Sequence, residues 1–266
     1  MKIFDCITFY QENFITNLRF EILYDVVDFF VICESKYDHR GKEKNYNFIL
    51  NNPIFKNKII YLKMDNPFLS KIDYWQNQAI QREYIFHGLR GADDNDYIMF
   101  SDPDEIPNPV ILKKINLEKK YGIFMQKCFC YKFNIFNKYE SPWEGTRITK
   151  MKNLKSIDYL RQKILSKNLS APFWKFKKDK SIELIQNGGW HFNSLLSPEE
   201  ISIKLKTFAH KEFSSNEYSD VKIIKKNIIE KRDLFKRGWT YEKVQLDETF
   251  PRYINQNKTL LKDWII

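Results

Sequence analysis

The stretch Asp96-Tyr-Ile-Met-Phe-Ser-Asp-Pro-Asp-Glu-Ile-Pro107 decides the fold prediction. Its apolar run from Tyr97 to Phe100 predicts a buried strand, and two carboxylates, Asp102 and Asp104, follow at a turn stiffened by proline. Clustered carboxylates repel one another and resist burial unless a cation lies between them. Oxygen ligands of this kind suit Mg²⁺ or Mn²⁺. The alternative is a solvated turn in which an aspartate caps the next helix.

Strands and helices alternate through the rest of the amino-terminal half. Strands are predicted at residues 2–6, 28–33 and 58–63, and helical spacing appears around residues 14–22, 46–51 and 75–89. This alternation favours an α/β fold with a mostly parallel central sheet flanked by helices. Ligands of such sheets bind at the carboxyl ends of the strands, which is where Glu34 and Asp102 are expected.

The carboxyl-terminal half has a different pattern. Aromatic-rich strands are predicted within residues 122–136, a turn at residues 141–145, and a strand with a loop at residues 187–192. Helices are expected after a capping box at residues 197–200 and from Val221 to Phe235. With no repeat or low-complexity linker, the sequence favours one domain over residues 1–266, with an alternating half at 1–109 and a second half with C-terminal helices at 110–266.

Composition indicates a globular protein with anionic partners. Lys and Arg exceed Asp and Glu by 10, which favours nucleotides, nucleic acid or an acidic membrane surface. We find no signal peptide and no apolar run suited to a membrane span, so a cytoplasmic location is expected, with peripheral membrane association as an option. The four cysteines lack zinc-ligand spacing and are interpreted as reduced, mostly buried thiols.

Eight segments, in this order, resemble glycosyltransferase family 17. They are Phe4–Cys6, Asn17–Glu21, Asp25–Asp28, Val31–Glu34, His39–Lys42, Asp102–Pro107, Gly189–His191 and Phe250–Tyr253. The resemblance implies a GT-A-like fold, a UDP-sugar donor (UDP-GlcNAc for animal members), a divalent metal ion and inversion at the anomeric carbon. The membrane anchor and stem of animal members have no counterpart here. We therefore expect a bacterial or viral surface glycan, built on a carrier, as the acceptor.

Candidate donor-site residues follow from the residues and the resemblance together. Asp104 is expected to bind the metal, Asp102 to reach the metal or the ribose, and His191 to supply a later metal ligand. Arg82 is a candidate phosphate clamp, with a surface ion pair as the alternative. Glu34 is a candidate for binding the uridine or, alternatively, a helix cap or ion pair. His39 and Lys42 are expected over the donor or else in a solvated loop.

An inverting transfer also needs a general base near the acceptor hydroxyl. Glu144 is the predicted base, with Glu199 and Asp247 as rivals, and Trp143 and Trp190 are candidates for stacking on sugars. Two other functions use the same features: a metal-dependent phosphohydrolase or nucleotidyltransferase, and a basic nucleic-acid-binding protein. Against the latter, the sequence carries no helix-turn-helix, zinc-finger or RNP-type pattern.

Overall fold

The computed structural model describes residues 1–68, 73–172, 174–175, 178–207 and 215–266. Its strands are β1 (Ile3–Phe9), β2 (Phe29–Ser35), β3 (Ile59–Met64), β4 (Tyr97–Ser101), β5 (Glu105–Pro107), β6 (Tyr121–Cys130), β7 (Ile135–Phe136), β8 (Trp143–Lys150), β9 (Ile182–Asn193) and β10 (Glu242–Lys243). Its α-helices are α1 (Asn13–Leu23), α2 (Tyr74–Tyr84), α3 (Pro109–Leu112), α4 (Ile157–Lys163), α5 (Pro198–Thr207), α6 (Asn216–Ser219), α7 (Val221–Ile229) and α8 (Arg252–Gln256). Short 3₁₀ helices lie at Pro53–Lys58, Ile85–Gly88, Met151–Asn153, Ser166–Asn168 and Lys262–Trp264.

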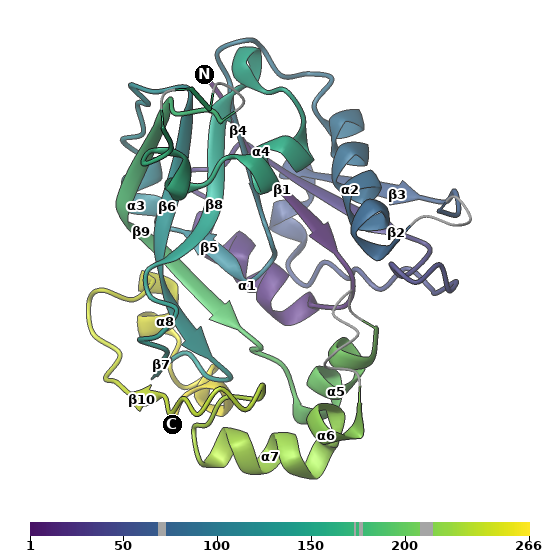
Figure 1. Ribbon diagram of the computed structural model, residues 1–266, viewed down its shortest axis with the longest axis vertical. Coiled ribbons are helices and arrows are strands. Elements are labelled where there is room, and N and C mark those ends of the chain that lie inside the picture. The colour runs from purple at the N-terminus through teal and green to yellow at the C-terminus, as the bar shows by residue number, and fades with distance from the viewer. Residues whose placement is uncertain (69–72, 173, 176–177, 208–214) are drawn as a thin grey trace.

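These strands form one mixed sheet in the order β10-β7-β6-β8-β4-β1-β2-β3, with β5 and β9 joined to it through β6 (Figure 1). The parallel pairing predicted for the amino-terminal half is confirmed, because β4, β1, β2 and β3 are all parallel neighbours. Beyond β4 most pairs are antiparallel, so the sheet is mixed rather than mostly parallel. The expected boundary at residue 109 falls at the start of α3, within this continuous sheet.

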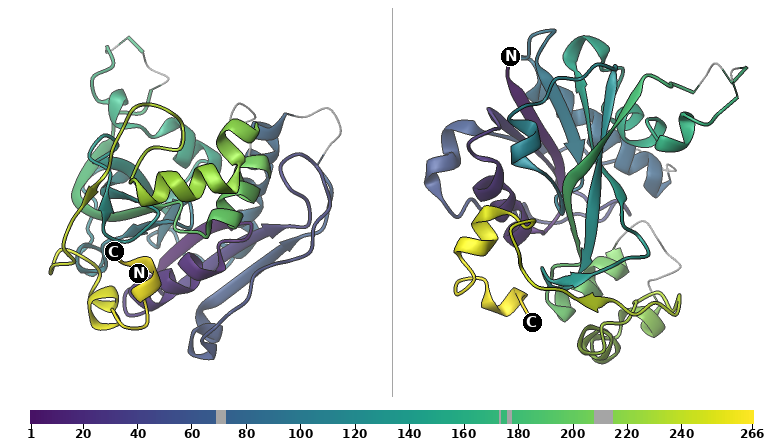
Figure 2. Two further views of the ribbon diagram at one scale, coloured as in Figure 1. Left: turned by 90° about the horizontal axis from the view of Figure 1, so that it is seen from below. Right: turned by 90° about the vertical axis from the view of Figure 1, so that its left-hand side faces the viewer.

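The central strands β1, β2 and β4 are mostly apolar because both faces of the sheet are covered, with Asp5 and Glu34 as buried exceptions. Phe30 and Ile32 face one core cluster, whereas Val31 and Cys33 face the other. The C-terminal segment packs on the first face beside α1, as both views of Figure 2 show, and Phe14 stacks on Trp264 with ring centroids 4.7 Å apart. Two buried faces explain why these strands lack the alternation of half-exposed strands.

One predicted helix is wrong. Residues 46–51 form no helix, because long-range side chains hold their backbone N–H groups. Glu34 accepts hydrogen bonds from the N–H groups of Asn47 and Phe48, and Asn13 accepts one from Ile49. These bonds replace the i to i−4 bonds that a helix would need.

The predicted capping box is confirmed at the start of α5. The backbone N–H of Ser197 donates to the Glu200 carboxylate at 2.8 Å, and the N–H of Glu200 donates to the Ser197 hydroxyl at 3.2 Å. The next predicted helix, α7, ends at Ile229 and does not reach Phe235. Figure 1 shows α5, α6 and α7 below the carboxyl end of β1. In the described part of the chain, no helix combines the length and apolar character needed to cross a membrane.

Candidate active site

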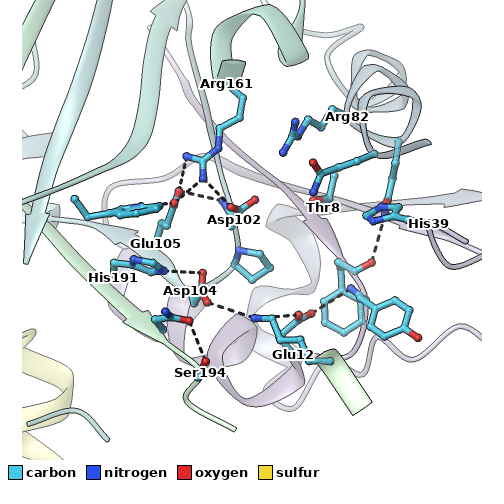
Figure 3. Close-up of a pocket in the computed structure, with 18 of the residues that line it drawn as sticks. Thr8, Glu12, His39, Arg82, Asp102, Asp104, Glu105, Arg161, His191 and Ser194 are labelled. Atoms are coloured by element: carbon cyan, nitrogen blue, oxygen red, sulfur yellow. Dashed lines mark hydrogen bonds and ion pairs between the residues drawn. The ribbon is translucent and has the colours of Figure 1, made fainter. Parts of the chain in front are cut away.

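A cavity of about 930 Å³ lies at the carboxyl ends of β1, β2 and β4. Thr8 and Ser35 line it from β1 and β2, and the acidic turn that follows β4, the strand next to β1, lines it beside Thr8 (Figure 3). Helices α2, α4 and α5 and strands β8 and β9 complete its wall. The cavity therefore occupies the edge where doubly wound sheets bind their ligands.

A buried arginine on α1 fixes the backbone of the acidic turn, residues 102–105. Arg19 on α1 pairs with Asp5 at 2.6 Å and donates to the backbone carbonyl of Glu105 at 2.7 Å. The N–H of Asp102 donates to the Glu105 carboxylate at 3.2 Å, which closes the turn on itself. Asp102 and Asp104 are thus presented to the cavity on a backbone with fixed partners.

Arg161 on α4 holds the turn from the cavity side. Its guanidinium lies 2.7 Å from Asp102 Oδ2 and makes a two-pronged contact with Glu105 at 2.7 and 3.0 Å. Burial acts to raise the pKa of the Asp102 carboxyl, but the positive charges of Arg161 and Arg82 outweigh it and hold that pKa below its usual range. Asp102 is therefore an ionised ion-pair partner of Arg161.

Asp104 lies between a histidine and a lysine. Strand β5 pairs with β9 so that Glu105 stands opposite His191, and this register brings His191 Nε2 within 3.6 Å of Asp104 Oδ1. Lys204 on α5 approaches the other oxygen of Asp104 at 3.8 Å. Burial raises the pKa of the Asp104 carboxyl, and the charge of Lys204 offsets only part of that effect.

The three predicted metal ligands are only partly brought together. Asp104 and His191 are neighbours, whereas Asp102 is turned toward Arg161. Within the described ranges, no group of three or more His, Cys, Asp or Glu side chains has the arrangement of a metal site.

The two candidate sugar-stacking tryptophans have different surroundings. Trp143 lines the cavity, donates its indole N–H to Glu105 at 2.7 Å and packs on the His191 ring, with centroids 4.8 Å apart. Trp190 is buried in the core and donates to the backbone carbonyl of Thr249, so it does not line the cavity. Of these two candidates, Trp143 is the one placed to contact a ligand.

His39 lies at the other end of the cavity, on the side of Thr8 and away from His191 (Figure 3). The side-chain amide of Gln81 donates to the backbone carbonyls of Cys33 and Phe9, so its oxygen accepts the 2.8 Å bond from His39 Nε2. Burial lowers the pKa of His39, which favours a neutral ring with its proton on Nε2. His39 is thus fixed in position and tautomer.

Arg82 lines the cavity from α2 and is almost fully buried. Its Nη1 donates to Asp158 at 2.8 Å, but its Nε has no hydrogen-bond partner among the described residues. A buried donor of this kind leaves Arg82 available for an anionic ligand in the cavity.

Two predicted donor-site residues lie outside the cavity wall. Glu34 is fully buried and holds the segment after β2, with contacts of 2.5 Å to Lys44 and 2.6 Å to the Tyr61 hydroxyl. The alternative interpretation, an internal ion pair, therefore describes Glu34 better than uridine binding. Lys42 is exposed and does not line the cavity.

Comparison with known proteins identifies the family. The model of glycosyltransferase family 17 matches residues 1–244, most of the chain. The chain belongs to glycosyltransferase family 17. The acidic turn, Arg19 and His191 of the enzyme all lie within the matched region.

The curated relatives share its sequence at low identity. The enzyme is 24% identical over 270 residues to the rat β-1,4-mannosyl-glycoprotein 4-β-N-acetylglucosaminyltransferase and 23% identical to the human one, with 92% of this chain covered in each case. The chain spans about half the length of these relatives, 49%.

Solved structures similar to this chain include the following two. One is a glycosyltransferase involved in glycosylation of the major capsid of PBCV-1, with a TM-score of 0.32, 9% identity, and coverage of 70% of this chain and 82% of that one. The other is the glucosyl-3-phosphoglycerate synthase of M. tuberculosis, with a TM-score of 0.37, 10% identity, and coverage of 76% and 75%. Scores this low carry no argument about function.

Family membership settles the class of the protein. It is a member of a glycosyltransferase family, with the α/β fold expected from its sequence. This assignment replaces the phosphohydrolase or nucleotidyltransferase and the nucleic-acid-binding protein considered as alternatives.

Glu144, the predicted general base of the transferase, lines the cavity. It lies on β8 rather than in the predicted turn, because it pairs with Met125 of β6. Its carboxylate accepts hydrogen bonds from the hydroxyl and the backbone N–H of Ser166, the latter at 3.1 Å, and lies 3.3 Å from Arg147. These contacts orient the carboxylate, and its role as base remains a prediction.

The rival bases lie elsewhere. Glu199 is exposed on α5 and pairs with Lys225 at 2.9 Å, and Asp247 is exposed and bonded to Thr249. Neither lines the cavity.

Sequence reasoning missed Glu105, Arg161 and Lys204. Glu105 had a signal, because it belongs to the same acidic stretch as Asp102 and Asp104. Arg161 and Lys204 had none, because each lies on a helix far along the chain and meets the turn only through tertiary packing.

Proposed function

We propose that the enzyme transfers N-acetylglucosamine from UDP-GlcNAc to a glycan acceptor, with inversion and with the help of a divalent metal ion. The transferase activity for which the curated relatives are named supports the choice of sugar. The observation that carries the proposal is the meeting of the acidic turn with His191, Arg82 and Lys204 in one cavity. A nucleoside diphosphate needs such cationic side chains, and a metal ion needs such oxygen and imidazole ligands.

The residues fit a metal ion in part. Two ligand atoms about 2.1 Å from one octahedral ion lie about 3 Å apart, and Asp104 Oδ1 and His191 Nε2 are 3.6 Å apart. Asp104 and His191 would therefore hold the ion, which would neutralise charge on the departing diphosphate as a Lewis acid. Asp102, held by Arg161, is better placed to accept hydrogen bonds from the ribose.

The protein's own side chains divide the remaining tasks. Arg82 and Lys204 offer positive charge to the phosphates. Trp143 offers a ring face to a sugar, and Glu144 is the proposed base that takes the proton from the acceptor hydroxyl. We assign residues 1–109 mainly to the donor and residues 110–266 to the acceptor.

For the acceptor, we propose a bacterial or viral surface glycan built on an anionic carrier, which the formal net charge of +10 favours. We propose a cytoplasmic location as well. Its support is that all four cysteines, Cys6, Cys33, Cys128 and Cys130, are free and buried, as expected in a reducing compartment.

Calorimetry with UDP tests the metal and donor together. We expect Mn²⁺ or Mg²⁺ to strengthen UDP binding and Asp104→Ala to remove most of that gain. Asp25→Ala, an exposed aspartate outside the cavity, is the matched control and should bind like the wild type. Equal UDP affinity with and without a chelator would reject metal dependence, and a preference for a GDP- or CMP-sugar in a donor panel would reject UDP-GlcNAc.

A further inference from the structure

Gln78, in the wall of the cavity, has a buried amide oxygen without a hydrogen-bond partner among the described residues. It lies on α2, lines the cavity and is only 8% exposed. Its Oε1 has no hydrogen-bond partner among the described residues. Leaving a buried acceptor unpaired is costly, and native proteins seldom do so without a ligand or water to fill the need. Gln78 therefore points to a ligand group that donates a hydrogen bond.

The position of α2 indicates which part of the ligand carries the group that donates a hydrogen bond to Gln78. Gln81, less than one turn further along α2, is tied to the backbone carbonyls of Phe9 and Cys33 at the ends of β1 and β2, and Asn77 donates to the carbonyl of His39. Figure 3 shows His39 and Thr8 on the side of the cavity opposite His191. Gln78 thus belongs to the end over β1 and β2, away from the side chains proposed to act on the sugar.

The neighbouring Arg82 indicates how a nucleotide would be oriented in the cavity. It lies one helical turn after Gln78 on the same face of α2 and also lines the cavity, and its Nε likewise has no partner among the described residues. Figure 3 shows Arg82 between His39 at one end and Arg161, the partner of Asp102, on the other side. A phosphate at Arg82 would leave the nucleobase beside Gln78.

We propose that Gln78 selects the base of the donor, with its Oε1 accepting a hydrogen bond from the N3–H of uracil. This inference rests on the proposed function. Uracil carries a hydrogen on N3, whereas N3 of cytosine is a bare acceptor. In the amide orientation of the structure, cytosine would face the Gln78 oxygen with a second lone pair, and its binding would require the amide to turn over. A site built to pair with an N–H discriminates against an analogue that lacks it.

The test compares UDP with CDP by calorimetry on the full chain in the presence of Mn²⁺. The wild type should bind UDP about 10- to 100-fold more tightly than CDP. Gln78→Met keeps the length of the side chain but removes the amide, and should lose most of that ratio. Gln76→Met, at an exposed position of the same helix, is the matched control and should keep it.

Thermal unfolding separates this role from a structural one. Because Gln78→Met removes an unpaired buried group, the melting temperature should be unchanged or higher, whereas a structural glutamine would lower it on replacement. The inference is overturned if the wild type binds CDP as tightly as UDP. It is also overturned if Gln78→Met keeps the wild-type ratio of UDP to CDP affinity, although metal-dependent UDP binding would still stand in that case. It is also overturned if Gln78→Met weakens UDP-GlcNAc but not UDP, because the partner is then the acetamido N–H of the sugar. A wild type that binds no UDP at all would reject the proposed donor together with this inference.

Discussion

Replacing Arg161 by methionine should destabilise the enzyme strongly. Arg161 is the shared partner of Asp102 and Glu105, and the Glu105 side chain is fully buried. Methionine would keep the apolar part of the side chain but leave the Glu105 carboxylate with only the N–H groups of Trp143 and Asp102. Removing one partner of a buried ion pair costs about 3–5 kcal/mol because an unpaired charge stays buried. For a chain of this size that corresponds to a fall of about 6–20 °C in melting temperature.

Denaturant unfolding of a double-mutant cycle measures this effect. Neutralising the stranded carboxylate by Glu105→Gln should recover part of the loss, so the double variant should lose at least about 1 kcal/mol less than the sum of the single variants. Arg232→Met, which breaks an exposed pair with Glu230, is the control and should cost less than about 1 kcal/mol. Independent, additive losses at Arg161 and Glu105 would refute the reasoning.

The same cycle has a pH dependence with a definite sign. The folded pKa of Asp102 lies below its usual value, so its ion pair stabilises the protein above the unfolded pKa of about 3.9. That contribution is lost as the pH falls through the folded pKa. The difference in free energy of unfolding between wild type and Arg161→Met should therefore become smaller below about pH 4. A difference that grows below that pH would contradict an ion pair between Asp102 and Arg161.

Two further predictions concern catalysis and backbone conformation. Glu144→Gln should lower the transfer rate by about 10²–10⁴-fold and leave the dissociation constant of UDP nearly unchanged. Glu199→Gln should keep near-wild-type transfer. The reverse result would assign the role of general base to Glu199. Gly189→Ala should lower the melting temperature more than Gly41→Ala. Both glycines have positive φ angles, 130° and 83°, so both substitutions strain the backbone. Of the two, only Gly189 has a neighbour in the way, because its added Cβ would lie 2.2 Å from the Ile106 carbonyl oxygen. Equal losses for the two alanine variants would show that contact with β5 is unimportant.

The sequence alone was sufficient for the framework of this protein. Strands buried on both faces are largely apolar, so β2 and β4 could be located from continuous runs such as the one ending at Phe100, although β1 also carries the buried Asp5. Because ligands bind where such strands end, the same runs placed Asp102 and Asp104 at a cavity. The family could be recognised because its short segments occur in order along the chain.

The local sequence pattern predicted the wrong secondary structure where side chains distant in the sequence determine the backbone conformation. The segment at residues 46–51 has helical spacing, yet its backbone N–H groups are held by Glu34 and Asn13. Glu34 looked like a ligand for uridine for the same reason: the end of a strand is visible in the sequence, whereas the segment folded over it is not.

Only the tertiary structure decided which side chains meet in the cavity. Arg161 reaches Glu105 across 56 residues of chain because α4 packs against the sheet, and His191 reaches Asp104 because β9 pairs with β5 in one register. Periodicity in a sequence reports which positions are buried, but it does not report the partner of a buried charge. That partner depends on where each helix docks and how each strand is aligned, which is why the turning of Asp102 toward Arg161 and the unpaired amide of Gln78 appear only in the folded chain.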